Sequence, residues 1–258
     1  TDALVPTGTT GESPTLTHEE HQRVIEIVVN AANRRVPVIA GTGSNSTDEA
    51  VSLTRFAKKV GADASLQVVP YYNKPTQEGM FRHFEKIARS VDLPIILYNI
   101  PGRCGVGMTP ETIARLSKVS QIVGVKESTG SMDQASHIMS LCGLTVISGA
   151  DSLTLPPLAL GAKGVISVIA NVLPGPVSAM VDAYFAGNHT KAQELHYKMF
   201  PLCRAMFIET NPIPVKRAMK LLGLCEDEVR LPLCPMGADN EKALVRALKA
   251  YGLAVNQK

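Results

Sequence analysis

The stretch IVGVKES, residues 122–128, is a short β-branched run followed by the lysine Lys126. Nearly continuous apolar runs of this kind are typical of strands that helices cover on both faces. Six more runs occur, each followed by a helical pattern or a capping signal, which predicts parallel strands joined by crossover helices. These runs are ALVPTG (3–8), VPVIAGTG (36–43), ASLQVVP (64–70), PIILYNI (94–100), LTVISG (144–149) and GVISVIA (164–170).

Seven repeats of one strand–helix unit predict an α/β fold, a (β/α)8 TIM barrel from which one unit is missing. The chain opens directly on a strand, so we expect the absent unit to be the first strand and helix. After the last strand only helical patterns follow, which predicts a barrel over 1–188 and a C-terminal helical region over 189–258. A doubly wound open sheet is the alternative, but no GxGxxG motif follows the first strand.

The composition is that of an ordinary globular protein. Hydrophobic residues make up 45% and charged residues 19% of the 258 residues, which argues against a disordered chain. The net charge of +3 comes without a basic run, so we expect no nucleic-acid partner. The longest uncharged run, 164–181, is broken by Asn171 and by the Pro-Gly-Pro of 174–176, so we expect no membrane contact. Five scattered cysteines without a CxxC pair argue against a disulfide framework and favour the cytoplasm.

Lys126 stands where a barrel collects its catalytic groups, at the carboxyl end of a strand. Low-dielectric walls there would lower its pKa and free the amine to attack a carbonyl and form a Schiff base. The alternative is a structural lysine that reaches water or pairs with Glu127.

Three other strand ends add polar groups to the same face of the expected barrel. The GTTGES segment of residues 8–13 offers hydroxyls and backbone N–H groups that suit a carboxylate. Tyr72 follows another strand, and Tyr98 ends a third with Arg103 just beyond it. Each feature also has a purely structural interpretation as a turn, a core tyrosine or a loop cover. Their convergence on one face favours an active site.

The segments GTTGES, PYYNKPTQEG, LYNIPGR, GVKESTG and GVISV, in this order and spacing, resemble the dihydrodipicolinate synthase family of pyruvate-dependent class I aldolases. The resemblance covers essentially the whole chain. It implies a lyase of the diaminopimelate and lysine pathway that condenses pyruvate with L-aspartate 4-semialdehyde and needs no cofactor. It also implies a homo-oligomer, a tetramer of tight dimers.

The resemblance also implies roles for individual residues. Lys126 would form the Schiff base, while Tyr98, Thr9 and Tyr72 would relay protons, with Tyr72 reaching in from a neighbouring subunit. Thr9 and Thr10 would hold the pyruvate carboxylate. The remaining substrate contacts would come from Arg103, which receives the carboxylate of the aldehyde, and from the backbone of Gly149 and Ile166.

A second, allosteric site for L-lysine is implied at a subunit interface. The HEEH of 18–21 does not fit the HExxH zinc motif, because its histidines are three residues apart, and we expect no metal. Glu49 also completes a capping box with Ser46, and the histidines also fit a solvated first helical turn. The residues implied at the lysine site are Ser13, His18, His21, Asn45, Glu49 and Tyr71.

Two alternatives to this function stay open. Related aldolases for keto-deoxy sugar acids or N-acetylneuraminate are the first, although Arg103 suits a short substrate that carries an α-amino carboxylate. The second is a non-catalytic relative, since a barrel without its first strand would have an open seam beside Thr9.

Overall fold

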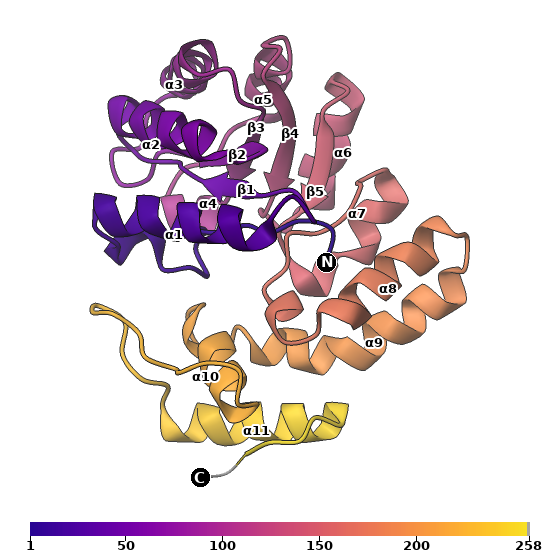
Figure 1. Cartoon of the computed structure of the whole chain (residues 1–258). Helices are drawn as coiled ribbons and strands as arrows, with labels where there is room; N and C mark the ends of the chain where they lie inside the picture. The colour runs from indigo at the N-terminus through magenta and orange to yellow at the C-terminus, as the bar shows by residue number, and fades with distance from the viewer. Residues whose placement is uncertain (257–258) are drawn as a thin grey trace. The chain divides into compact units, whose positions relative to one another are not determined.

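The computed structural model describes residues 1–256 and divides into two compact units (Figure 1). The strand unit holds Asp2–Gly8 and Leu16–Ile166. The helical unit holds Thr1, Thr9–Thr15 and the chain from Ser167 onward. This division differs from a boundary at residue 188, and a barrel over 1–188 with an appendage over 189–258 stays a prediction.

The strand unit is built on one parallel sheet whose spatial order follows the sequence order. This arrangement confirms the predicted alternation of parallel strands and crossover helices, for which parallel neighbours are the expected result. Its strands are β1 (Ile39–Gly41), β2 (Ala64–Val68), β3 (Ile95–Asn99), β4 (Ile122–Glu127) and β5 (Thr145–Ser148).

The first and last expected strands are the exceptions. Leu4 makes only an isolated parallel bridge to Val38, and Val165 makes one to Ser148. In the first run Pro6 has no N–H to donate, and Thr7 has a φ of 53°, outside the extended region. In the last run the chain turns into the short 3-10 helix η3 (Ile169–Asn171). The expectation of seven strands was therefore wrong for the described residues, where both runs continue the sheet only as single bridges.

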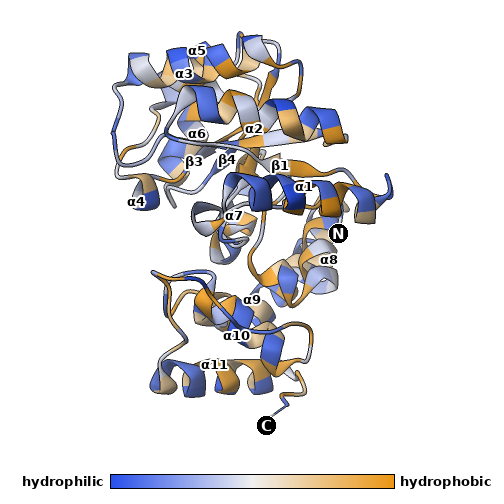
Figure 2. Cartoon of the chain, turned by 60° about the vertical axis from the view of Figure 1, so that its left-hand side comes forward, coloured by the Kyte–Doolittle hydropathy of each residue, from blue (hydrophilic) through white to orange (hydrophobic). Residues whose placement is uncertain are grey.

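Several helices of the strand unit begin at a side-chain cap, and the first of them has the Thr-x-x-Glu spacing of a capping box in its sequence. Thr17 accepts a hydrogen bond from the backbone of Glu20, whose side chain accepts one from Thr17 in return, a complete capping box. Figure 2 shows polar and apolar bands alternating along these helices, as amphipathic crossover helices require. They are α1 (His18–Ala32), α2 (Thr47–Val60), α3 (Gln77–Ser90), α4 (Pro101–Cys104), α5 (Pro110–Leu116), α6 (Met132–Leu141) and α7 (Leu155–Leu160), with the 3-10 helix η2 (Asp151–Leu153).

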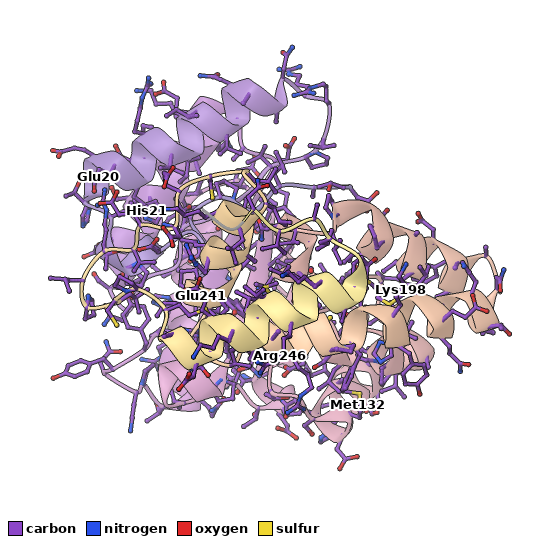
Figure 3. All side chains as sticks on the ribbon, turned by 90° about the horizontal axis from the view of Figure 1, so that it is seen from below. Glu20, His21, Met132, Lys198, Glu241 and Arg246 are labelled. Carbon is purple, nitrogen blue, oxygen red and sulfur yellow. The ribbon has the colours of Figure 1, made fainter. Side chains whose placement is uncertain are left out.

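The helical unit packs around antiparallel α8 and α9, and α11 lies against α9 and α10 (Figure 1). Arg217 stabilises this unit by pairing with Asp227 at 2.9 Å and with Glu241. Figure 3 shows Glu241 on α11. Within residues 1–256 no helix is long and apolar enough to cross a membrane. The elements are η1 (Ser13–Thr15), η3, α8 (Pro174–Phe185), α9 (His189–Ala205), α10 (Ile213–Leu221) and α11 (Ala238–Tyr251).

Candidate active site

Lys126 is a buried lysine on the sheet. Lys126 is 9% exposed, and the pairing of β4 with β3 places it beside Tyr98, which is 6% exposed. The Lys126 Nζ lies 4.1 Å from the centroid of the Tyr98 ring. The interpretation in which Lys126 escapes to water is therefore wrong, and so is a pairing with Glu127, whose carboxylate has other partners.

Burial lowers the pKa of the Lys126 ammonium to about 8, because the charged form loses its hydration. The carboxylate of Asp151 opposes this change, and the guanidinium of Arg103 adds to it. At pH 8 about half of such an amine is neutral, against roughly one in 300 for an ordinary lysine. The strand end therefore supplies a nucleophilic amine near neutral pH.

Gly149 leaves space for the Lys126 side chain because it has no Cβ. A Cβ built on Gly149 would lie 1.7 Å from Ser128 Oγ and 3.0 Å from Lys126 Cε. Ser128 Oγ is itself buried and has no hydrogen-bond partner among the described residues. Ile166, also expected at the site, packs against the apolar cluster that contains Tyr98. Both backbone positions thus lie in the surroundings of the lysine and the tyrosine.

A polar network beside the two strand ends was missed by sequence reasoning. Glu127 is 7% exposed and accepts hydrogen bonds from the Thr129 N–H at 2.7 Å and from Asn99 Nδ2 at 3.1 Å. Asn99 Oδ1 in turn accepts from the Met108 N–H at 3.0 Å. Burial raises the pKa of Glu127. Polar residues directly after Tyr98 and Lys126 were the available signal for this network.

Asp151 is the second group that sequence reasoning missed. It is 6% exposed and lies in η2, just after β5, and it is the acid whose charge raises the pKa of Lys126. An acid that closely follows a strand end of an expected barrel was the signal for it.

The other expected catalytic residues lie in different settings. Arg103 is exposed on α4, although its charge influences Lys126. Tyr72 is 90% exposed and has a φ of 69°, so within one chain it is not gathered with Lys126 and Tyr98. Thr9 and Thr10 belong to the helical unit, where Thr10 Oγ1 accepts a hydrogen bond from Asn211 Nδ2 at 3.0 Å.

The expected lysine-binding residues fall into groups. His18 Nε2 lies 2.7 Å from Glu49, and Asn45 Nδ2 donates to the Tyr71 carbonyl at 3.2 Å. Burial and the charge of Glu49 raise the pKa of the Tyr71 hydroxyl. His21 is 5% exposed on α1 (Figure 3), with Nε2 2.7 Å from the carbonyl of Gly41 at the end of β1. Ser13 lies in the helical unit.

The alternative interpretation, in which both histidines lie on a solvated first helical turn, holds for one of them only. It is correct for His18, which is exposed, and wrong for His21, which is buried. Burial lowers the pKa of the His21 imidazole, which favours its neutral form. Among the described residues no group of three or more His, Cys, Asp or Glu side chains is arranged to hold a metal ion.

Known proteins resemble the whole of this chain. A sequence model of the dihydrodipicolinate synthetase family matches residues 1–251. A 4-hydroxy-tetrahydrodipicolinate synthase of Geotalea daltonii is 57% identical over 255 residues, which cover 98% of this chain and 88% of the relative. The crystal structure of dihydrodipicolinate synthase from Aquifex aeolicus, 53% identical, matches with a TM-score of 0.98 and covers 100% of this chain and 89% of that chain.

A third relative was crystallised with a ligand. The synthase from Cyanidioschyzon merolae, solved with lysine bound, is 43% identical with a TM-score of 0.95 and covers 98% of this chain and 87% of that chain. These matches confirm the predicted barrel class of fold with C-terminal helices. They also confirm the predicted lyase function. The chain belongs to the dihydrodipicolinate synthetase family.

Proposed function

We propose that the chain condenses pyruvate with L-aspartate 4-semialdehyde, the 4-hydroxy-tetrahydrodipicolinate synthase reaction, through a Schiff base on Lys126. The observation that carries this proposal is the buried Lys126 amine, 4.1 Å from the Tyr98 ring, with a pKa lowered to about 8. Membership of the family supports the same chemistry.

The chemistry begins when the neutral Lys126 amine adds to the keto carbon of pyruvate and water leaves, giving a protonated imine. The imine nitrogen withdraws electrons, so a methyl proton is lost and an enamine forms. The enamine carbon then attacks the aldehyde of the second substrate. Attack of that substrate's amine on the imine carbon closes the ring and frees the lysine.

Other residues have supporting roles in this proposal. Tyr98, whose ring lies beside Lys126, passes protons together with Thr9 and Tyr72. Thr9 and Thr10 hold the pyruvate carboxylate. Arg103, exposed and positively charged, receives the carboxylate of the aldehyde substrate by paired hydrogen bonds. Gly149 and Ile166 line the pocket with their backbone.

The exposure of Tyr72 supports a homo-oligomer. The Tyr72 side chain is 90% exposed in one chain, so it is free to enter a site on a second copy. We therefore propose that Tyr72 completes the site of a partner, within a tetramer of tight dimers. The five cysteines are free thiols, which fits our further proposal that the chain works in the cytoplasm.

L-lysine is proposed as an inhibitor at the second site. Glu49 offers a carboxylate to the ammonium groups of an amino acid, and His18, Tyr71 and Asn45 beside it offer hydrogen-bonding groups. The lysine-bound relative from Cyanidioschyzon merolae supports this assignment. The complete proposed set is Ser13, His18, His21, Asn45, Glu49 and Tyr71.

The test is to incubate the folded chain with pyruvate, reduce it with borohydride and locate the adduct by mass spectrometry. We expect one pyruvate-derived adduct, on Lys126. The variant Lys126→Met should form none, while Lys118→Ala, at an exposed lysine just before β4, should form it normally.

The free energy of unfolding of Lys126→Met should exceed that of the wild type by about 1–3 kcal/mol at pH 7. The reason is that a buried ammonium is replaced by an apolar group of similar shape. A folded wild-type chain without an adduct, or one trapped at another lysine, would contradict the proposed function.

A further inference from the structure

The carboxylate of Glu12 connects the hydroxyl segment of residues 8–13 to the C-terminal part of the helical unit. Its side chain is only 10% exposed and pairs with Lys216 Nζ on α10 at 2.6 Å. The second carboxylate oxygen accepts a hydrogen bond from the Arg230 N–H at 3.0 Å. Two segments that are 204 residues apart in sequence therefore meet at this one acid.

The contacts around Glu12 hold the carboxylate in its charged form. Burial alone would raise the pKa of Glu12, but the Arg230 N–H and Lys216 outweigh it and hold that pKa below its usual value. Lys216 also donates to the carbonyl of Glu228, and the guanidinium of Arg230 donates to the carbonyl of Thr15 at 3.1 Å. Arg230 thus contacts both Glu12 and Thr15, while the carbonyl of Glu228 binds the lysine that pairs with Glu12.

The same region of the chain also holds a proposed substrate-binding hydroxyl. Asn211, 5% exposed and just before α10, donates from Nδ2 to Thr10 Oγ1 at 3.0 Å. Glu12 adopts a left-handed φ of 54°, and its N–H donates to the Thr9 carbonyl at 3.2 Å. This conformation is uncommon for a residue with a side chain, so outside contacts must stabilise it.

We propose that Glu12 and Lys216 are a positioning pair that orients Thr9 and Thr10 for the pyruvate carboxylate. The C-terminal helices then have a function beyond packing, because α10 sets the affinity of a site on a distant segment. This inference rests on the proposed roles of Thr9 and Thr10. A misoriented pair of hydroxyls weakens substrate binding without removing the reacting amine.

The experiment compares Glu12→Gln and Lys216→Met with the matched control Lys220→Met. Lys220 lies on the same helix and pairs with Glu226 and Asp227, each at 2.9 Å, near the surface. We expect each test variant to raise the KM for pyruvate roughly tenfold while kcat changes by less than about threefold. The control should keep both constants within about twofold.

Two more variants separate positioning from stability. Lys216→Arg should restore most of the affinity for pyruvate, since it keeps a cation beside Glu12. The double variant Glu12→Gln with Lys216→Met should be no worse than either single variant, as expected for residues that act as a pair. A lowered Tm with an unchanged KM for pyruvate, or additive effects in the double variant, would overturn the inference.

Borohydride trapping keeps this inference distinct from the proposed function. Wild-type chain that is trapped on Lys126, together with test variants of unchanged KM, would overturn the positioning role alone. Wild-type chain that is folded but never trapped on Lys126 would overturn the proposed function, and with it the role of the pair.

Discussion

Lys126 and Tyr72 are two proposed catalytic residues with opposite surroundings. Lys126 is 9% exposed on β4, and its neighbours across the sheet determine where its amine lies. Tyr72 is 90% exposed on the loop after β2, in a left-handed conformation. The comparison teaches that the strands build the nucleophile within one chain, whereas the proton relay that we propose needs a second copy to bring Tyr72 to a site.

The largest effect is expected from a change beside the buried Lys126. Gly149→Ala places a methyl group 1.7 Å from Ser128 Oγ and 3.0 Å from Lys126 Cε. We expect kcat/KM to fall at least about a hundredfold, because the amine is displaced. We also expect the free energy of unfolding to fall by about 1–3 kcal/mol through overpacking.

Steady-state kinetics and denaturant unfolding measure these two quantities. Gly164→Ala is the matched control, since a Cβ there meets no atom within 4 Å. Normal activity of Gly149→Ala would show that the lysine has room that this structure does not give it.

A smaller effect is expected from a change at the exposed Tyr72. Tyr72→Phe should lower kcat by roughly ten- to a hundredfold, since a proton donor is lost. Its Tm should stay within a few °C of the wild type, because the change removes one hydroxyl and keeps the ring. Tyr197→Phe on α9, where the tyrosine is 71% exposed, is the control and should change neither quantity.

Mixing the inactive Lys126→Met variant with the impaired Tyr72→Phe variant then distinguishes a relay within one chain from a relay between chains. Lys126→Met chains that are refolded together with Tyr72→Phe chains should recover up to about a quarter of wild-type activity, because some sites pair an intact lysine with an intact tyrosine. Absence of any recovery, with mixed oligomers demonstrated by mass spectrometry, would place Tyr72 in the site of its own chain.

The smallest expected effect refines the account of the lysine. The wild-type rate of imine formation should rise with pH, with its midpoint at about 8, and then level off as the Lys126 ammonium loses its proton. The Asp151 carboxylate raises that pKa, so Asp151→Asn should lower it and move the profile to lower pH. Arg103 lowers the same pKa, so Arg103→Gln should move the profile to higher pH.

Single-turnover trapping between pH 6 and 10 would measure both shifts. Asp92→Asn, at an exposed acid paired with Lys58, is the control for the loss of one carboxylate and should leave the profile in place. Shifts in the same direction for both test variants would contradict this electrostatic account.

Prediction from sequence succeeded where the signal was local. Short apolar runs defined β1 to β5, and Thr17 with Glu20 marked the start of α1 through a capping box that needs only four consecutive residues. The runs at 3–8 and 164–170 were expected to be strands, but each makes only a single bridge to the sheet. Apolar composition does not distinguish a single bridge from a full strand.

Some candidate site residues were predicted from the sequence and others were not. Lys126, Tyr98 and Gly149 were expected from strand ends and from the family resemblance, and the structure gathers these three. Glu127, Asn99 and Asp151 were not expected, because their importance depends on partners that no spacing reveals. Whether Tyr72, Thr9 and the lysine-binding set have their proposed roles stays a prediction.

The sequence by itself determined the alternation of strands and helices and the presence of a lysine at a strand end. Hydrophobic period and capping are properties of neighbouring residues, so they can be read along the chain. Only the tertiary structure decided that Lys126 is buried beside Tyr98 and that Glu12 meets Lys216 across 204 residues. Desolvation and ion pairing depend on distances in space, which set the pKa of the amine and bring Glu12 together with Lys216.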